Sequence, residues 1–154
     1  MTPDILAHLD DTPDFYLDQV AQVVMDRWSS GRVGLLGDAA FSSSPMSGQG
    51  TGLALVGAYL LAGELAAAGW DPDAGFARYE ARMRSFVEAN QEIGRLNARS
   101  RDVPGPDAEP RDFGGEWFAE LVGRAINGVE LPDYAEVPDS AASAGSPITS
   151  SAKP

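Results

Sequence analysis

The chain has 154 residues, of which 44% are hydrophobic, so it can form one domain with a modest core and is not disordered throughout. Its net charge of −12 argues against binding to nucleic acid or to an anionic membrane surface, because like charges repel. The sequence contains no cysteine and a single histidine, His8, which excludes disulfides and thiolate metal sites and argues against any metal centre.

The first residues lack the basic and apolar regions of a signal peptide, so a cytoplasmic location is expected. Thr-Pro-Asp at residues 2–4 is typical of a helix start, and a short helix is predicted from there to Leu9. The β-branched residues of Val20–Met25 predict a strand. After a turn at residues 28–31, Arg32–Leu36 predicts a second strand, which is apolar on both faces and therefore expected to be buried.

A loop rich in Ser, Gly and Pro covers residues 41–50 and leads into a long segment rich in Ala and Leu. This segment, Thr51–Ala68, predicts a helix that packs in a protein core rather than in a membrane. Its apolar run is shorter than the roughly 20 residues that a membrane span needs, and Glu64 interrupts it. Gly69 is typical of the C-terminal end of such a helix.

A second long helix is predicted from Pro72 to about Arg99, because Asp71 can cap it and proline suits its first turn. Residues three and four apart, most of them aromatic or apolar, form a stripe along it, which we interpret as packing surface without a cofactor role. The stripe consists of Phe76, Tyr79, Met83, Phe86, Asn90 and Ile93. On another face, Glu80 and Arg84 have the spacing of an ion pair.

The last third of the chain changes in composition. Residues 101–113 contain three prolines and several charges and predict a linker. Residues 117–125 predict a short amphipathic helix that ends at Asn127-Gly128. Residues 135–154 contain Ala, Ser, Gly and Pro with almost no large apolar residue, which predicts a disordered tail.

The most informative pattern lies where the second predicted strand ends. Gly37-Asp38 follows that strand, and a loop with Pro45 leads to Gly48-Gln49-Gly50 at the start of the first long helix. This order places one carboxylate and several backbone N–H groups together beside a helix N-terminus. Such a corner suits a polyhydroxylated, partly anionic cofactor.

Residues 31–63 resemble the second flavin-binding motif of the FAD-dependent aromatic hydroxylases, the single-component flavoprotein monooxygenases related to para-hydroxybenzoate hydroxylase. The matching elements are Gly31-Arg32-Val33, Gly37-Asp38-Ala39-Ala40, Pro45, Gly48-Gln49-Gly50 and the apolar run 53–65. The resemblance covers about residues 2–134. It implies the α/β class, here as the C-terminal fragment of a two-domain FAD-binding monooxygenase fold that is mostly helical with about two strands.

By this resemblance, FAD is the cofactor, NAD(P)H reduces it, and O₂ supplies one oxygen atom to an organic substrate, aromatic or polyketide-like. The Asp38 carboxylate is expected to accept a hydrogen bond from a ribityl hydroxyl, and Pro45 to stiffen the loop beside the flavin ring. The alternative for Asp38 is a cap for the loop that follows. The implied cofactor-binding residues are Gly37, Asp38, Pro45, Gly48, Gln49, Gly50 and Thr51. No catalytic side chain is named, because Phe41 stands where many relatives have His or Tyr.

Two further motifs of this family do not occur in the sequence. It contains no Gly-x-Gly-x-x-Gly after a strand, which cradles the FAD pyrophosphate, and no Asp-Gly pair. We therefore expect the C-terminal part of a monooxygenase that binds FAD weakly or not at all by itself, is inactive alone, and exposes apolar surface. A separately encoded N-terminal half is the partner that this view suggests.

The expected division follows from the same resemblance. Residues 1–30 would be a remnant of a substrate domain with one helix and one strand, and residues 31–100 the FAD-binding segment. Residues 101–134 would be a linker with a terminal helix, and residues 135–154 the tail.

Two other functions fit the same sequence. A non-catalytic remnant could act as a protein-interaction module that packs its helices on a partner. A generic anion- or nucleotide-binding loop is the weaker alternative, because residues 41–51 contain no Lys or Arg to complement phosphate charge.

Overall fold

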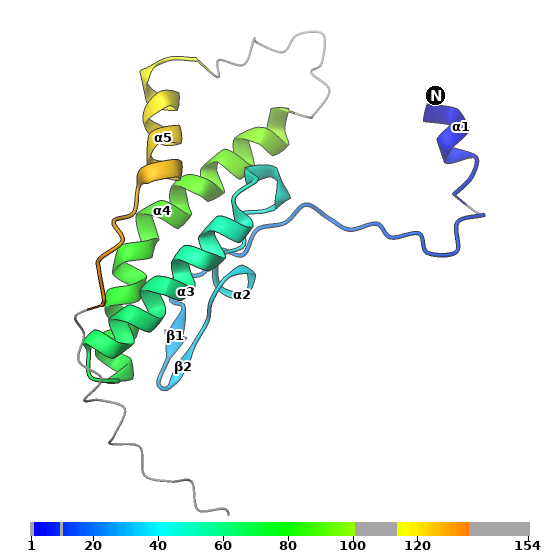
Figure 1. Cartoon of the computed structure of the whole chain (residues 1–154). Coiled ribbons are helices and arrows are strands. Elements are labelled where there is room, and N and C mark those ends of the chain that lie inside the picture. Colours follow the sequence, from blue (N-terminus) through cyan, green and yellow to red (C-terminus); the bar gives the residue numbers. More distant parts are fainter. Residues whose placement is uncertain (1, 10, 101–113, 136–154) are drawn as a thin grey trace, which may run out of the picture.

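The computed structural model describes residues 2–9, 11–100 and 114–135, and helices dominate them (Figure 1). The elements, in chain order, are α1 (Thr2–Leu6), β1 (Ser29–Ser30), β2 (Val33–Gly34), α2 (Asp38–Phe41), the 3-10 helix η1 (Pro45–Ser47), α3 (Gly50–Ala67), α4 (Pro72–Ser100) and α5 (Glu116–Asn127). The prediction of a mostly helical chain with two strands is confirmed. The predicted linker and all but the first residue of the predicted tail lie outside the described residues.

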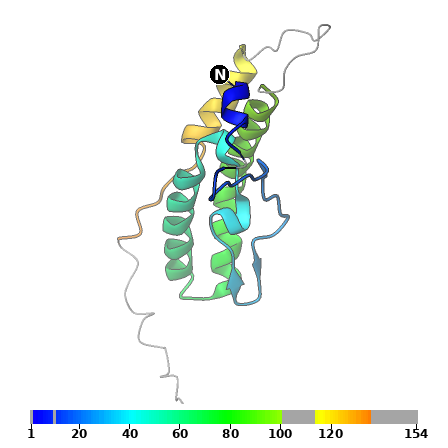
Figure 2. The same cartoon turned by 90° about the vertical axis from the view of Figure 1, so that its right-hand side faces the viewer.

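Helices α3 and α4 form an antiparallel hairpin and lie side by side in both views (Figures 1 and 2). The turn between them follows the predicted signals. Gly69 has a φ of +63°, and the Asp71 carboxylate accepts the backbone N–H groups of Asp73 and Ala74 at the start of α4. The carboxylate therefore satisfies two of the donors that a helix N-terminus leaves without an intrahelical partner.

Trp28 lies at the centre of the main core and is only 1% exposed. Its ring centroid lies 4.8 Å from that of Phe41 in α2 and 5.8 Å from that of Tyr79 in α4. Trp28 thereby joins the β-hairpin, α2 and α4 into one apolar cluster. All residues of the predicted α4 stripe are buried except Ile93, which is partly buried, so its interpretation as packing surface is confirmed.

Helix α5 packs on the C-terminal half of α4 through a second, smaller cluster of Leu121, Ala125 and Ala89. The fully buried Asn90 amide donates from Nδ2 to the Phe86 carbonyl at 2.9 Å and to the Ala125 carbonyl at 3.0 Å. It thus satisfies a carbonyl in the last turn of α5, a position that lacks an intrahelical donor.

The residues after α5 return along the helical hairpin as an extended segment (Figure 1). The Tyr134 hydroxyl donates to the buried Glu64 carboxylate of α3 at 2.7 Å, and the same oxygen accepts the Arg82 Nε–H of α4. Burial, together with this hydrogen bond, raises the pKa of the Tyr134 phenol above its ordinary 10.0. This cluster of Glu64, Arg82 and Tyr134 ties α3, α4 and the returning segment together.

Two strand predictions need correction. Val20–Met25 is extended but forms no strand, because a strand needs a hydrogen-bonded neighbour. Among residues 2–9, 11–100 and 114–135, its one backbone partner is the Ser42 carbonyl, which accepts the Val23 N–H. The second predicted strand shrinks to Val33–Gly34, paired antiparallel with Ser29–Ser30 across a two-residue turn. Both residues of β2 are exposed, so the predicted burial of this strand is wrong for them.

Helix α3 is long and apolar enough to cross a membrane by length and composition alone, which is weak evidence because core helices pass the same test. One face of it, including Leu53 and Leu60, is buried in the protein, whereas Leu55 on another face is 68% exposed. The prediction of a core helix is therefore confirmed for one face, and the expected exposed apolar surface is present on the other.

Candidate functional site

A hollow of about 320 Å³ lies where α2, the following loop, η1 and the start of α3 meet. It is lined by Asp38, Ser42, Ser43, Ser44, Pro45, Gly48, Gly50 and Thr51. Five of the seven residues predicted from the sequence are in this lining. The other two are its chain neighbours: Gly37 is buried directly before α2, and Gln49 directly precedes α3.

Asp38 is the first residue of α2, and its side chain is exposed at the hollow. Within the described part of the chain, neither a hydrogen bond nor an ion pair engages its carboxylate, and α2 begins without a side-chain cap. The capping role considered from the sequence is therefore not what the structure shows. An ionised carboxylate in this position is an acceptor with unused capacity that faces solvent.

The start of α3 faces the same hollow. A Cβ built on Gly50 would lie 4.0 Å from the Asp38 carboxylate oxygen, so the bare backbone of α3 and the carboxylate lie close together. The first turn of α3 contains no acidic residue, and its first backbone N–H groups have no intrahelical acceptors. The positive end of the helix dipole is thus available to an electron-rich group bound beside Asp38.

The loop between α2 and α3 is closely constrained. Gly48 ends η1 with a φ of +69°, a left-handed conformation that glycine adopts without steric cost. Ser44 has a φ of +68° and a ψ of 157°, a region almost confined to glycine, where other residues store about 1–3 kcal/mol of strain. The Ser44 hydroxyl compensates in part by accepting the backbone N–H of Met46.

Three serines provide much of the lining and were not among the residues predicted from the sequence: Ser42, Ser43 and Ser44. A run of small polar residues between a Gly-Asp pair and a proline was the available signal. No lining residue is basic, which leaves the anion-loop alternative without a cation to complement a phosphate.

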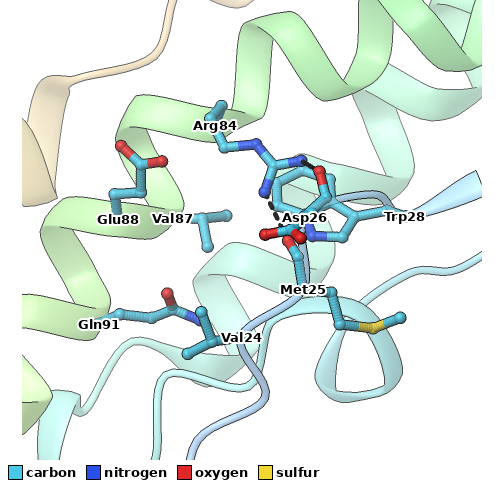
Figure 3. A pocket seen from close by; sticks show the side chains of 8 residues that line it. All are labelled: Val24, Met25, Asp26, Trp28, Arg84, Val87, Glu88 and Gln91. Atoms are coloured by element: carbon cyan, nitrogen blue, oxygen red, sulfur yellow. Dashed lines mark hydrogen bonds between the residues drawn. The ribbon is translucent and has the colours of Figure 1, made fainter.

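A second hollow, of about 280 Å³, lies between the extended residues before β1 and the outer face of α4 (Figure 3). Arg84 donates to the carbonyls of Met25 and Asp26 and lies 4.0 Å over the Trp28 ring. It also forms the predicted ion pair with Glu80. The guanidinium is therefore engaged in fastening the extended segment to α4, and this hollow contains none of the residues predicted to bind a cofactor.

The model of the family described as FAD binding domain matches residues 11–93, which include the whole first hollow. An uncharacterized protein of Mycobacterium tuberculosis is 45% identical over 130 residues, covering 84% of this chain and 32% of that protein. A flavin-dependent monooxygenase of Legionella longbeachae is 42% identical over 137 residues, covering 86% of this chain and 34% of that protein.

Among solved structures, the tetracycline destructase Tet(55) superposes with a TM-score of 0.69 at 42% sequence identity. The match covers 86% of this chain and 35% of that protein. The chain thus spans about a third of the length of the relatives that it matches. With more than half of its residues inside the family match, the chain belongs to the FAD binding domain family and is similar to the FAD-dependent monooxygenases.

Proposed function

We propose that this chain supplies one part of the FAD site of a flavoprotein monooxygenase, in which NAD(P)H and O₂ serve to oxygenate an organic substrate. The observation that carries the proposal is the free Asp38 carboxylate beside the bare N-terminus of α3. The family match over residues 11–93 supports FAD as the molecule that this corner contacts.

The residues of the hollow fit the polar half of a flavin. Asp38, as an acceptor, suits a ribityl hydroxyl, and the first N–H groups of α3 suit the oxygen-rich pyrimidine edge of the ring. Pro45 and Gly48 limit the bulk and the mobility of the wall. FAD, when bound, would supply the redox and oxygen chemistry, while the chain positions it and keeps water from one side.

The substrate class is proposed from the relatives. Tet(55) is by its name a destructase of tetracycline, which supports an aromatic or polyketide-like organic substrate for the complete enzyme. The chain spans about a third of the length of such relatives. We therefore expect the remaining FAD contacts and the substrate contacts to come from a companion segment, for example a separately encoded N-terminal half.

A second candidate is a non-catalytic interaction module. We call residues 11–27 the N-terminal arm. The interaction module is favoured by exposed apolar side chains on this arm, where Phe15, Leu17 and Val24 are 54%, 81% and 70% exposed. Such side chains suit contact with another protein surface. The two candidates differ in whether Asp38 matters for binding a flavin.

The test replaces the matching third of the Legionella longbeachae flavin-dependent monooxygenase with this chain and measures FAD per polypeptide after purification. We expect near-stoichiometric FAD in the chimera and little in the 154-residue chain alone. Asp38→Asn should weaken FAD binding by about tenfold or more, since hydrogen bonds to a charged group contribute roughly 1.5–3 kcal/mol.

Glu120→Gln, which neutralises an exposed carboxylate on α5, is the matched control and should leave FAD binding unchanged. A folded chimera without flavin would contradict the proposal and favour the interaction module. Stoichiometric FAD on the chain alone would contradict the expected dependence on a companion segment.

A further inference from the structure

The serine wall of the first hollow, residues 42–45, is held in place by residues that do not line the hollow. Val23 N–H donates to the Ser42 carbonyl, and the Gln22 side chain donates to the Ser43 carbonyl at 3.0 Å. From α4, the Asn97 side chain donates to the Met46 carbonyl at 2.9 Å. The wall is therefore bonded to the N-terminal arm, and Met46, the residue that follows the wall, is bonded to α4.

The Gln22 amide uses all of its polar atoms in these contacts. Nε2 donates to the carbonyls of Ser43 and Gln91, the second at 2.7 Å, and Oε1 accepts from Arg95 at 3.2 Å. In return, Gln91 Nε2 donates to the Val23 carbonyl at 2.7 Å. The arm, the wall and α4 are thus joined at one partly buried amide.

Gly94 makes this junction sterically specific. It is buried within α4, and a Cβ built on it would overlap the Ser43 carbonyl oxygen and lie 2.7 Å from Gln22 Nε2. The same Cβ would lie 3.3 Å from the Ser44 hydroxyl. Because Ser43 contacts it through its backbone, relief of the overlap requires movement of the wall itself and not only of a side chain.

The wall also needs such support. The left-handed backbone of Ser44 is a conformation that persists only where its surroundings fix it. The Ser44 carbonyl accepts the backbone N–H and the hydroxyl of Ser47, so this strained residue also organises η1, which contains Pro45. A displacement at Ser43 would therefore be passed on to Pro45 and the other residues that line the hollow.

We propose that Gln22, acting with Gly94, is a positioning residue for the FAD site: it fixes the Ser43 carbonyl and through it the wall of the hollow. The role rests on the proposed function, and Gln22 is not among the residues that line the hollow. The sequence pattern of the flavin motif begins after Gln22, so the motif alone does not identify it.

The first test uses the 154-residue chain without flavin. Gln22→Met keeps the length of the side chain and removes its polar atoms. We expect hydrogen exchange of the amides at residues 46–49 to become about tenfold faster, since the wall loses a partly buried hydrogen bond.

Asn90→Ala is the matched control, because Asn90 is another α4 amide whose NH₂ donates to two carbonyls, but its cross-helix partner is α5. It should lower the thermal midpoint and speed exchange in α5 while residues 46–49 keep their rates. Equal effects of both variants on residues 46–49 would mean general loosening and would overturn the positioning role.

The second test measures FAD dissociation constants and flavin absorption spectra in the chimera. Gln22→Met and Gly94→Ala should each weaken FAD binding by about tenfold and shift the spectrum, and the double variant should be little worse than either, because both act at the Ser43 carbonyl. Asn90→Ala should change the dissociation constant by less than about twofold.

The outcomes are separable. A wild-type chimera that folds but holds no flavin contradicts the proposed function. A flavin-loaded chimera whose affinity and spectrum are unchanged by Gln22→Met contradicts the positioning role alone.

Discussion

At the scale of single residues, the molecule depends on several places where a missing side chain lets another group approach. Gly63 in α3 is the clearest after Gly94, since a Cβ there would overlap the ring of Tyr134. The hydroxyl of that ring reaches the buried Glu64, so the ring cannot withdraw without breaking this hydrogen bond. Steric fit and polar contact therefore fix the same side chain.

Gly63→Ala should destabilise the chain by about 1–3 kcal/mol, as overpacking in a filled site does. The measurement is urea unfolding followed by circular dichroism. The double variant Gly63→Ala/Tyr134→Ala should lose less than the sum of the two single losses, because the second change removes the overlap. Strict additivity would show that the ring does not occupy this place in solution.

The residues that line the first hollow were predictable to the extent that they belong to the flavin motif. Asp38, Pro45 and Gly48 stand in a spacing that a sequence can reveal, because the motif is contiguous. Gln22 and Gly94 were not predictable, since their role arises from contacts between segments about 70 residues apart. Asn90 appeared only as one position in an apolar stripe, although its amide joins two helices.

At the scale of elements, helix α4 organises its neighbours. It contacts α3, η1 and α5, and its Arg84 fastens the end of the N-terminal arm by bonds to the Met25 and Asp26 carbonyls. These bonds take the place of the sheet partner that the predicted strand Val20–Met25 lacks. The arm is therefore held by side chains of a helix and not by a backbone ladder.

Arg84→Met keeps much of the aliphatic volume and removes the charge. The chain should lose about 2 kcal/mol of stability, since charged hydrogen bonds and a cation–π contact are lost together. Residues 24–28 should also become more susceptible to limited proteolysis. Arg78→Met, at an exposed position of the same helix, is the control; an equal loss there would mean that the effect comes from net charge alone.

Elements that depend on nearby residues could be predicted from the sequence, whereas elements that depend on distant segments could not. Helices α3, α4 and α5 could be predicted closely, because caps, periodicity and the glycine after α3 act within one helix. The strands could not, because strand formation depends on a partner elsewhere in the chain. The four-residue α2 and the three-residue η1 were not predicted, because they lie in a loop whose glycine, serine and proline content hides such short turns.

At the scale of the whole molecule, stability in alkali should depend on two phenols, Tyr79 and Tyr134. Burial, aided by the charge of Glu80, raises the pKa of Tyr79, and burial with the Glu64 hydrogen bond raises that of Tyr134. Their folded-state pKa values thus exceed the ordinary 10.0 of the unfolded chain. The stabilisation by the neutral phenols is complete below pH 10.0 and is lost as the pH rises above it, because unfolding then releases protons.

The free energy of unfolding should therefore fall as the pH rises above about 10, with a smaller fall in Tyr134→Phe than in the wild-type chain. Urea titrations at several pH values give this slope directly. A wild-type curve that stays flat across the range, or a variant with the same slope, would contradict the assignment.

The whole molecule also shows what remains exposed. Leu55 on α3 and most apolar residues of the N-terminal arm lie at the surface. The chain spans about a third of the length of its relatives. From the missing pyrophosphate-binding motif, the sequence predicted exposed apolar surface on the α3 segment but not on the arm. It did not predict that the arm would lie against α4 through Gln22 and Arg84.

Gln22 belongs to the N-terminal arm and donates to the Ser43 carbonyl in the wall of the hollow. On the positioning role proposed for it, the arm and a bound FAD would be thermodynamically linked. A partner that binds the arm and holds it in this conformation should raise the affinity for FAD. By thermodynamic reciprocity, bound FAD should raise the affinity of the arm for that partner. Detachment of the arm from α4 would weaken both the binding of the partner and the binding of FAD. On this proposal, docking of a companion segment and binding of FAD would be cooperative.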